Sequence, residues 1–257
     1  MTELSDRHRE YLFEPFERIL MVRQVELFKL LDLLCYGLTE LTALPELTTA
    51  LRKPSEAIEQ AKQHAELAQR EIDRGFSSLV GQSIIVLWGA LEALIKDFLV
   101  RWLELFPNLW ERPGIASLKI RIGDYEALRP EDRRRYVIGE IERNVAAKLK
   151  VGAGRFEAVL SELELGGGID DSIRRDLLEL SAVRNVLVHN AGHVDERFMA
   201  MCPWVECEPG QLLRPTRKDY RRFSAAVLQY AALIVERAES CIGSNKSFKP
   251  MPLRGTA

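Results

Sequence analysis

The sequence is short of the features that mark several classes of protein. Its 257 residues include four cysteines, at positions 35, 202, 207 and 241, which are too scattered for a disulfide framework or a paired zinc site. We expect them to be free thiols in a reducing cytosol. Glycine (16 residues) and proline (11 residues) are too sparse for a low-complexity chain or a many-stranded sheet.

The sequence also has no charge excess and no long apolar run. The 36 Lys and Arg residues against 38 Asp and Glu give a net charge of −2, so any nucleic-acid binding must come from a local patch. Residues 1–10 are charged and lack the apolar segment of an export signal. The most apolar run, 79–95, is interrupted by Gln82, Ser83 and Glu92, which favours a buried core helix and no membrane span.

What the sequence has in quantity is apolar residues at intervals of three and four, the spacing of helices. Helices are predicted over about 8–36, 54–75, 77–106, 130–150, 155–163, 170–191 and 215–243. The segment 77–106 carries apolar residues over more than half of the helix circumference and is expected at the centre of the fold.

These segments predict an all-α protein, an up-and-down helical bundle. The stretch 194–213 changes character around Pro209 and Gly210, and a small β-hairpin is predicted there, before the last helix. We expect an N-terminal helical extension over 1–75, packed on a helical domain over 76–243, and a disordered tail over 244–257.

One cation stands where an apolar residue is expected. At about 100° per residue, Ile173, Leu177 and Leu180 share a helix face, and Arg184 lies in the middle of that face. A guanidinium cannot lose its charge, so the fold must supply a carboxylate, a pocket open to water or an anionic ligand. Glu92 also projects among apolar neighbours, and its partner is either Lys96, four residues on, or Arg184.

Arg184 belongs to a short motif at the end of this helix. Arg184 and Asn185 are followed by His189 after three further residues, and Gly192 then supplies a helix stop. The motif resembles that of the HEPN superfamily of all-helical domains, in which an arginine, usually followed by a polar residue, precedes a histidine by four to six positions. The resemblance extends over roughly 75–243, including the long helix around Trp88.

The resemblance implies a four-helix bundle that dimerises with the two motifs facing each other across a cleft. Many HEPN proteins are metal-independent endoribonucleases, toxins or effectors of antiphage and toxin–antitoxin systems, and others are noncatalytic. In some of the toxins a tyrosine two residues after the histidine is modified by a partner nucleotidyltransferase. This sequence has Ala191 at that position, which argues against that form of control.

The residues suit RNA cleavage on chemical grounds as well. His189 can move protons near neutrality, Arg184 can clamp a phosphate bidentately, and Asn185 can orient the histidine or the substrate. Glu92 is expected to hold Arg184. The alternatives are a His189 that only bonds a carbonyl at the helix end and an Arg184 that only forms a salt bridge with Glu92.

Helix geometry sets a condition on this site. Arg184 and His189 lie about 140° apart on an ideal helix, so one regular helix does not aim both at one phosphate. We therefore expect either that the helix loosens or ends before His189, or that Arg184 meets the histidine of a second subunit.

Four further residues are candidates for RNA binding. Arg133, Arg134 and Arg135 lie in the first turn of a predicted helix, and His193 follows the motif. The alternatives are a solvated face, because acidic residues are close to the arginines, and an ordinary loop histidine. No metal is expected, because His189 with His193 is too small a ligand set.

No cofactor is expected either. Residues 166–168 are three glycines without a preceding strand or a following lysine, so they form a turn and no phosphate-binding loop.

The leading hypothesis is a metal-independent endoribonuclease of a defence or toxin–antitoxin type, cytoplasmic and homodimeric through the 184–189 region. Its expected partners are RNA and an antitoxin or another defence-system protein, with no membrane. The second hypothesis is a noncatalytic HEPN-like module that binds RNA, a nucleotide or a protein, with the N-terminal helices as its docking surface. The third is a helical scaffold in which the motif is accidental.

Overall fold

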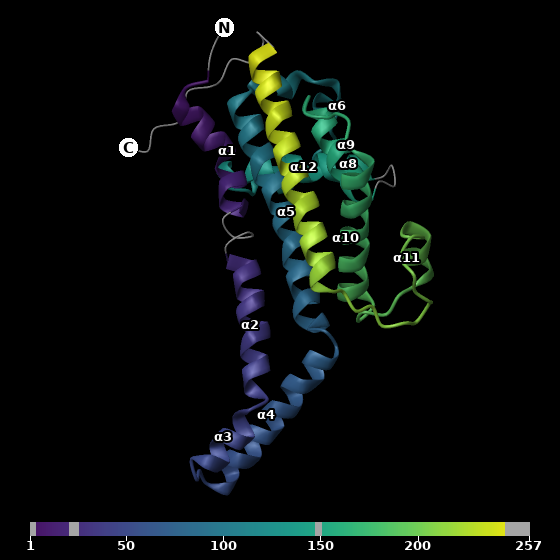
Figure 1. The fold of residues 1–257 in the computed structure, drawn as a ribbon. Coiled ribbons are helices and arrows are strands. Elements are labelled where there is room, and N and C mark those ends of the chain that lie inside the picture. Colours follow the sequence, from purple (N-terminus) through teal and green to yellow (C-terminus); the bar gives the residue numbers. More distant parts are fainter. Residues whose placement is uncertain (1–3, 21–25, 147–150, 245–257) are drawn as a thin grey trace. The chain divides into compact units, whose positions relative to one another are not determined.

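The computed structural model describes residues 4–20, 26–146 and 151–244, which are almost entirely helical (Figure 1). The helices in these ranges are α1 (Asp6–Leu20), α2 (Phe28–Leu41), α3 (Leu44–Ala50), α4 (Ser55–Asp73), α5 (Ser77–Leu105), the 3-10 helix η2 (Pro107–Glu111), α6 (Pro113–Ala116), α7 (Ile122–Glu126), α8 (Pro130–Ala146), α9 (Ala153–Glu162), α10 (Asp171–His189), α11 (Glu196–Met201) and α12 (Arg217–Ser244). The all-α class is therefore confirmed. Among the described residues, no helix is both long and apolar enough to cross a membrane.

The chain divides into two compact units, and each is assembled from separate stretches of sequence. Unit 1 comprises Met1–Ile19, Trp88–Ser181 and Ala225–Ala257, and unit 2 comprises Leu20–Leu87 and Ala182–Ser224. The predicted boundary after residue 75 stays a prediction.

Unit 1 has an aromatic core on α5. Phe98, Trp102 and Phe106 are completely buried. Phe98 meets Phe16 of α1 edge to face at 5.0 Å between ring centroids, and the rings of Trp102 and Phe106 are 4.5 Å apart. The buried indole of Trp102 donates a hydrogen bond to the carbonyl of Leu163 at 3.1 Å, so this large side chain is buried without an unsatisfied N–H.

Unit 2 contains α2, α3 and α4, in which α4 contacts the other two helices (Figure 1). The buried residues of α4 are Ala61 and Ala68, seven residues apart and so on one side of the helix. Alanine is small enough to allow the backbones of neighbouring helices to approach closely, as the narrow alanine stripe of the sequence suggests. At the other end of α2, the ring of Phe28 stacks on Tyr220 of α12 at 6.4 Å.

Helices occupy more of the N-terminal part than predicted. The helix predicted over 8–36 corresponds to α1 and the first part of α2, with 21–25 outside the described residues, and α2 and α3 extend over most of the stretch between the predicted helices 8–36 and 54–75. The tail predicted to be disordered lies outside the described residues from position 245 onward.

The predicted β-hairpin does not form as two strands. Its first half becomes helix α11, and within the described ranges its only β-pairing is an isolated antiparallel bridge between His193 and Leu212. Asp195 explains the difference, because its side chain accepts the backbone N–H of Phe198 at 2.7 Å and so caps the new helix. The aromatic and β-branched residues that suggested strands lie after this cap.

Candidate functional site

Helix α10 remains regular through His189, its last residue. The helix is then closed by the N–H of Gly192, which donates to the carbonyl of Val186 at 3.0 Å, six residues back. Gly192 has a φ of +84°, a backbone conformation that favours glycine, and Ala191 before it has a φ of +50°. The expectation that the helix loosens or ends before His189 is therefore wrong.

Arg184 and His189 nevertheless meet within one chain. Nη1 of Arg184 donates to Oδ1 of Asn185 at 3.1 Å and lies 3.4 Å from Nε2 of His189. The angle of about 140° describes where the side chains leave the helix, and the long, unbranched arginine side chain covers the difference. A second subunit is not needed to bring these two side chains together.

The contacts of Arg184 define the role of each polar atom. A guanidinium only donates, so Nε2 of His189 is the acceptor and the neutral ring carries its proton on Nδ1. Both hydrogens of Nη1 are then used, one on Asn185 and one on His189. In the described part of the chain, Nε and Nη2 of Arg184 have no hydrogen-bond partner, so they remain available to an anionic ligand.

Helix α10 buries the predicted face at Leu177 and Leu180, which are completely buried, and its last turns bury a further face. In these last turns Ala182, Val183 and Val186 are at most 5% exposed, whereas Val188 is 44% exposed. On an ideal helix this buried face lies roughly opposite Arg184. Arg184 continues the side of the helix that carries Leu177 and Leu180 and is half-buried.

A pocket of about 260 Å³ adjoins the motif, entirely within unit 2. Its lining includes Asn185 and His189 from α10 together with residues of the following loop and α11, namely Ala182, Val186, Asn190, Asp195, Arg197, Phe198 and Met201. The loop and α11 residues were not among the predicted site residues. The sequence does contain a signal for them, because an aspartate followed by a glutamate is typical of a helix start, and α11 begins at that point.

Two polar groups organise this pocket. The amide of Asn190 donates to Oδ2 of Asp195 at 2.7 Å. The N–H of Phe198 and this amide lower the pKa of Asp195, against a smaller opposing effect of burial, so the carboxylate stays ionised. Arg197 is exposed and has no ion pair or hydrogen bond among the described residues. A second cation thus stands beside His189.

Glu92 has a partner of its own in unit 1. Its Oε1 accepts a hydrogen bond from Nη1 of Arg155 at 3.2 Å, and Lys96, the other proposed partner, lies 3.6 Å from a carboxylate oxygen of Glu142. The predicted pairing of Glu92 with Arg184 would join the two units and stays a prediction.

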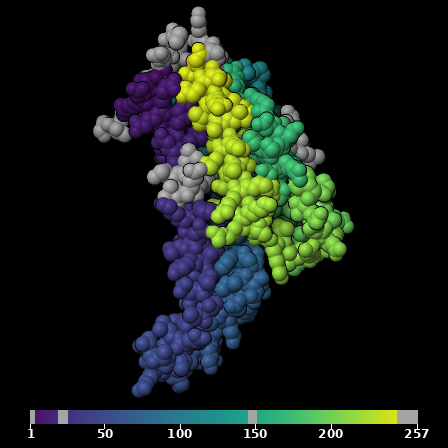
Figure 2. All heavy atoms as spheres, in the orientation of Figure 1, coloured from purple at the N-terminus to yellow at the C-terminus, as the bar shows by residue number. Residues whose placement is uncertain are grey.

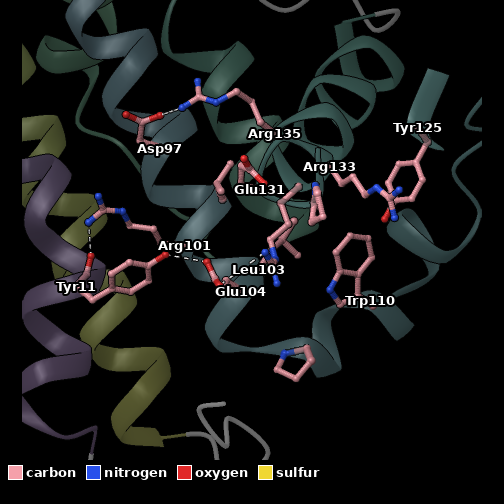
Figure 3. Close-up of a pocket in the computed structure, with 14 residues that line it drawn as sticks. Tyr11, Asp97, Arg101, Leu103, Glu104, Trp110, Tyr125, Glu131, Arg133 and Arg135 are labelled. Carbon is pink, nitrogen blue, oxygen red and sulfur yellow. Dashed lines mark hydrogen bonds and ion pairs between the residues drawn. The ribbon is translucent and has the colours of Figure 1, made fainter. Parts of the chain in front are cut away.

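The three consecutive arginines line a different pocket, of about 590 Å³ in unit 1 (Figure 3). Each has its own acidic partner. Arg133 donates to Glu126 at 3.0 Å, Arg134 lies 3.6 Å from Glu104, and Arg135 pairs with Asp97.

Aromatic side chains also line this pocket. The guanidinium of Arg133 lies over the ring of Tyr125 at 5.0 Å, on the same side of the view as Trp110. On the other side, Tyr11 donates to Glu104 at 2.7 Å, and burial together with this carboxylate raises the pKa of Tyr11 to about 12. The arginines thus belong to an ion-pair network, and RNA binding by them stays a prediction.

His193 lies in the loop after the motif. It is exposed, and its Nδ1 is 3.3 Å from the carbonyl oxygen of Asn190. It does not line the pocket beside His189. Among the described residues, no group of three or more potential ligands could hold a metal ion.

Comparison with known proteins adds no relative to these observations, because the chain matches no protein-family model, no curated protein and no solved structure.

Proposed function

We propose that this protein is a metal-independent endoribonuclease of the HEPN type, acting in a defence or toxin–antitoxin system. The observation that carries the proposal is the contact of one guanidinium nitrogen, Nη1 of Arg184, with both Asn185 and His189 beside an open pocket. A phosphate-binding cation, an orienting amide and a proton-transfer group thus converge in one chain. The motif resemblance described above supplies the reaction class.

The contacts suggest a sequence of events. A phosphodiester bound by Nε and Nη2 of Arg184 competes with the imidazole for this guanidinium, and the contact that must be exchanged is weak, at 3.4 Å and exposed to solvent. Its exchange frees the lone pair on Nε2 of His189. Substrate binding would therefore switch the histidine from an acceptor of Arg184 to a base facing the substrate.

The reaction is a transesterification. Nε2 of His189 takes the proton from a ribose 2′-hydroxyl, the 2′-oxygen bonds to phosphorus, and the bond from phosphorus to the 5′-oxygen breaks. The 5′-oxygen leaves with a proton from an acid, so the products are a 2′,3′-cyclic phosphate and a 5′-hydroxyl. Arg184 and Arg197 stabilise the added negative charge on the phosphorane.

The wider RNA path follows from the charges. Arg197, which forms no ion pair or hydrogen bond in the described ranges and acts on Asp195 only through its charge, is a cation beside His189 that can bind an adjacent phosphate. His193, in the loop between α10 and α11, is proposed as a further RNA contact next to this surface. Arg133, Arg134 and Arg135 contribute only if RNA phosphates displace their acidic partners.

The family resemblance also leads us to propose a homodimer at the motif, an antitoxin or other defence-system partner, and a cytoplasmic location. Beside the motif, Val188 and Leu212 are 44% and 43% exposed, which gives a second copy an apolar surface to cover. Glu92 is proposed to steady Arg184 in that assembly.

The test is cleavage of total RNA in the presence of a chelator. The wild-type protein should produce fragments with 2′,3′-cyclic phosphate and 5′-hydroxyl ends. His189→Ala should lose at least about 100-fold in rate, the scale of one general acid–base group. Arg184→Lys keeps the charge but loses the planar fork, and we expect a loss of about tenfold or more. His64→Ala removes an exposed histidine of α4 and serves as the matched control.

Full activity of His189→Ala would reject the catalytic assignment. A noncatalytic RNA-binding module is the second candidate, and it rests on Arg184, which forms no ion pair among the described residues. That module would bind RNA without cutting it, and Arg184→Ala and Arg197→Ala would weaken binding while His189→Ala would not.

A further inference from the structure

Helix α2 has two apolar faces, and only one of them is used inside unit 2. Leu31 and Cys35 are 2% and 4% exposed and form the buried face. On an ideal helix these two side chains lie within about 40° of each other. Leu30, Leu33 and Leu34 point elsewhere.

The second face is exposed to solvent. Leu30, Leu33 and Leu34 are 49%, 64% and 43% exposed, and the atoms of α2 lie at the surface in Figure 2. With Gly37 they occupy an arc of about 100°, the width of an ordinary packing stripe. A Cβ added at Gly37 would meet nothing within 4 Å, so the backbone itself is accessible there.

Charges of opposite sign border this stripe on one flank. Lys29 and Glu40 lie about 20° apart around the helix axis and near opposite ends of α2. Both side chains are exposed, and neither forms an ion pair within the described residues. The flank therefore carries a cation at its start and an anion at its end, and Glu26, which is also exposed, lies just before α2 on the side of the stripe.

We propose that the stripe Leu30–Leu33–Leu34–Gly37 binds a second copy of this chain, with the two α2 helices antiparallel. In such a pair the same flank of both helices lies on the same side, so Lys29 of each copy faces Glu40 of the other. The symmetry axis falls near Leu34. Leu30 then lies opposite Gly37 of the second copy, where the missing side chain leaves room for it.

The charge pattern favours a second copy of the chain as the molecule that binds the stripe. A two-fold axis makes the surface its own partner, so each charged residue is matched without requiring a further protein. A symmetric parallel pair would instead put the two charged flanks on opposite sides of the interface, so neither Lys29 nor Glu40 would meet its opposite charge. The proposal does not depend on the ribonuclease assignment, because it uses no residue of the 184–189 motif.

The contact should be weak on its own. Helix α2 has 14 residues and is therefore about 21 Å long, so two such helices bury an area at the low end for stable interfaces. We expect dissociation constants in the micromolar range and an association that weakens with added salt.

Charge reversal of the flank tests the proposal by sedimentation equilibrium of the full chain at low salt. Lys29→Glu and Glu40→Lys should each weaken self-association about tenfold, because each turns two attractive contacts of the symmetric pair into repulsive ones. The double variant should associate like the wild type. An equimolar mixture of the two single variants should form heterodimers more tightly than either variant forms homodimers.

The controls change the same charges elsewhere in unit 2. Lys53→Glu and Glu66→Lys alter exposed residues outside α2 and should leave association unchanged. Leu33→Glu should abolish the contact while retaining the wild-type circular dichroism spectrum. A wild-type chain that stays monomeric up to about 100 µM overturns the proposal.

A dimer unaffected by every α2 variant also overturns it and points to the motif region as the interface. Association of Lys29→Glu with Glu40→Lys that is no tighter than its association with the wild type would reject the antiparallel orientation.

Discussion

At the residue scale, Asp195 connects the candidate site to the local fold. One carboxylate oxygen caps α11 through the N–H of Phe198, and the other accepts the side-chain amide of Asn190 just after the motif. The same residue therefore starts a helix and fixes the loop that follows His189. Its lowered pKa reflects these two donors.

Two substitutions of Asp195 should distinguish the effect of its helix-capping hydrogen bond from the effect of its negative charge. Asp195→Ala removes the acceptor of the Phe198 N–H, and we expect unfolding to become easier by about 1 kcal/mol. Asp195→Asn keeps an acceptor for this N–H but cannot ionise. Because the pKa of Asp195 is lower in the folded state, its ionised form stabilises the protein above the unfolded-state pKa, and this contribution disappears as the pH falls through the folded-state value.

Urea unfolding measured by circular dichroism between pH 3 and pH 7 provides the test. The stability of the wild type relative to Asp195→Asn should decline toward acid pH, whereas the deficit of Asp195→Ala relative to Asp195→Asn should persist. A constant difference between the wild type and Asp195→Asn across this range would contradict the assigned pKa shift.

The motif illustrates what sequence reasoning could and could not establish at this scale. The residue types and spacing of Arg184, Asn185 and His189 predicted one site, and the structure brings these side chains into contact. Ideal helix angles failed to predict their contact, because such angles place Cβ atoms and ignore the reach of a long side chain. Arg197 was missed because α11, which presents it, was interpreted as strand.

At the element scale, Arg237 on α12 holds together α9 and the glycine turn that follows it. It donates to Glu157 at 2.8 Å, to the carbonyl of Leu165 at 3.2 Å and to the carbonyl of Gly168 at 2.7 Å. A Cβ at Gly167 would lie 2.8 Å from Nε of Arg237. Glycine is thus required here for the close approach of a cation, which the sequence pattern alone does not reveal.

Removing this cation should strongly destabilise unit 1. The side chains of Arg237 and Glu157 are only 12% and 15% exposed, so Arg237→Leu leaves a nearly buried carboxylate without its cation and two carbonyls without a donor. We expect a loss of about 3 kcal/mol or more in urea unfolding. Arg129→Leu breaks an exposed pair with Glu131 and should change stability by less than about 0.5 kcal/mol.

The same network contains Tyr230, whose hydroxyl donates to Glu157 at 2.8 Å. Burial, and then this carboxylate, raise the pKa of Tyr230. Tyr230→Phe keeps Arg237 in place, so its expected cost is smaller, about 1 kcal/mol. Equal stabilities of Arg237→Leu and the wild type would show that the network does not hold these elements.

Helix positions were the most predictable feature of the elements. The observed bounds of α4, α5, α9 and α12 lie within a few residues of the predicted ones, since apolar spacing and flanking proline or glycine both mark them. The prediction over 8–36 merged α1 and α2 because both carry the same apolar spacing. Periodicity does not distinguish one helix from two in succession.

At the scale of the whole molecule, the cations fall into two groups: those that pair with carboxylates of the fold and those that remain available to an anionic ligand. The sequence has nearly equal numbers of cations and anions, and many arginines, including all three at the start of α8, pair with carboxylates. Arg184 and Arg197, within the described ranges, form no ion pair. The net charge of the chain therefore says little about anion binding. The unpaired positive charges beside His189 are the better guide.

The four cysteines provide a test of the whole fold, because they are free and lie in both units. Burial raises the pKa of the thiols of Cys35, Cys207 and Cys241, and Cys202 is completely buried. Since only the thiolate reacts with iodoacetamide, the native protein at pH 8 should be alkylated at least about tenfold more slowly than the urea-unfolded chain.

Mass spectrometry should find Cys207 and Cys241, which are half-buried, modified before Cys35 and Cys202. Cys207→Ser should lose one early label and leave the slow pair unchanged. Rapid labelling of Cys202 in the native protein would contradict the packing of unit 2 around α11.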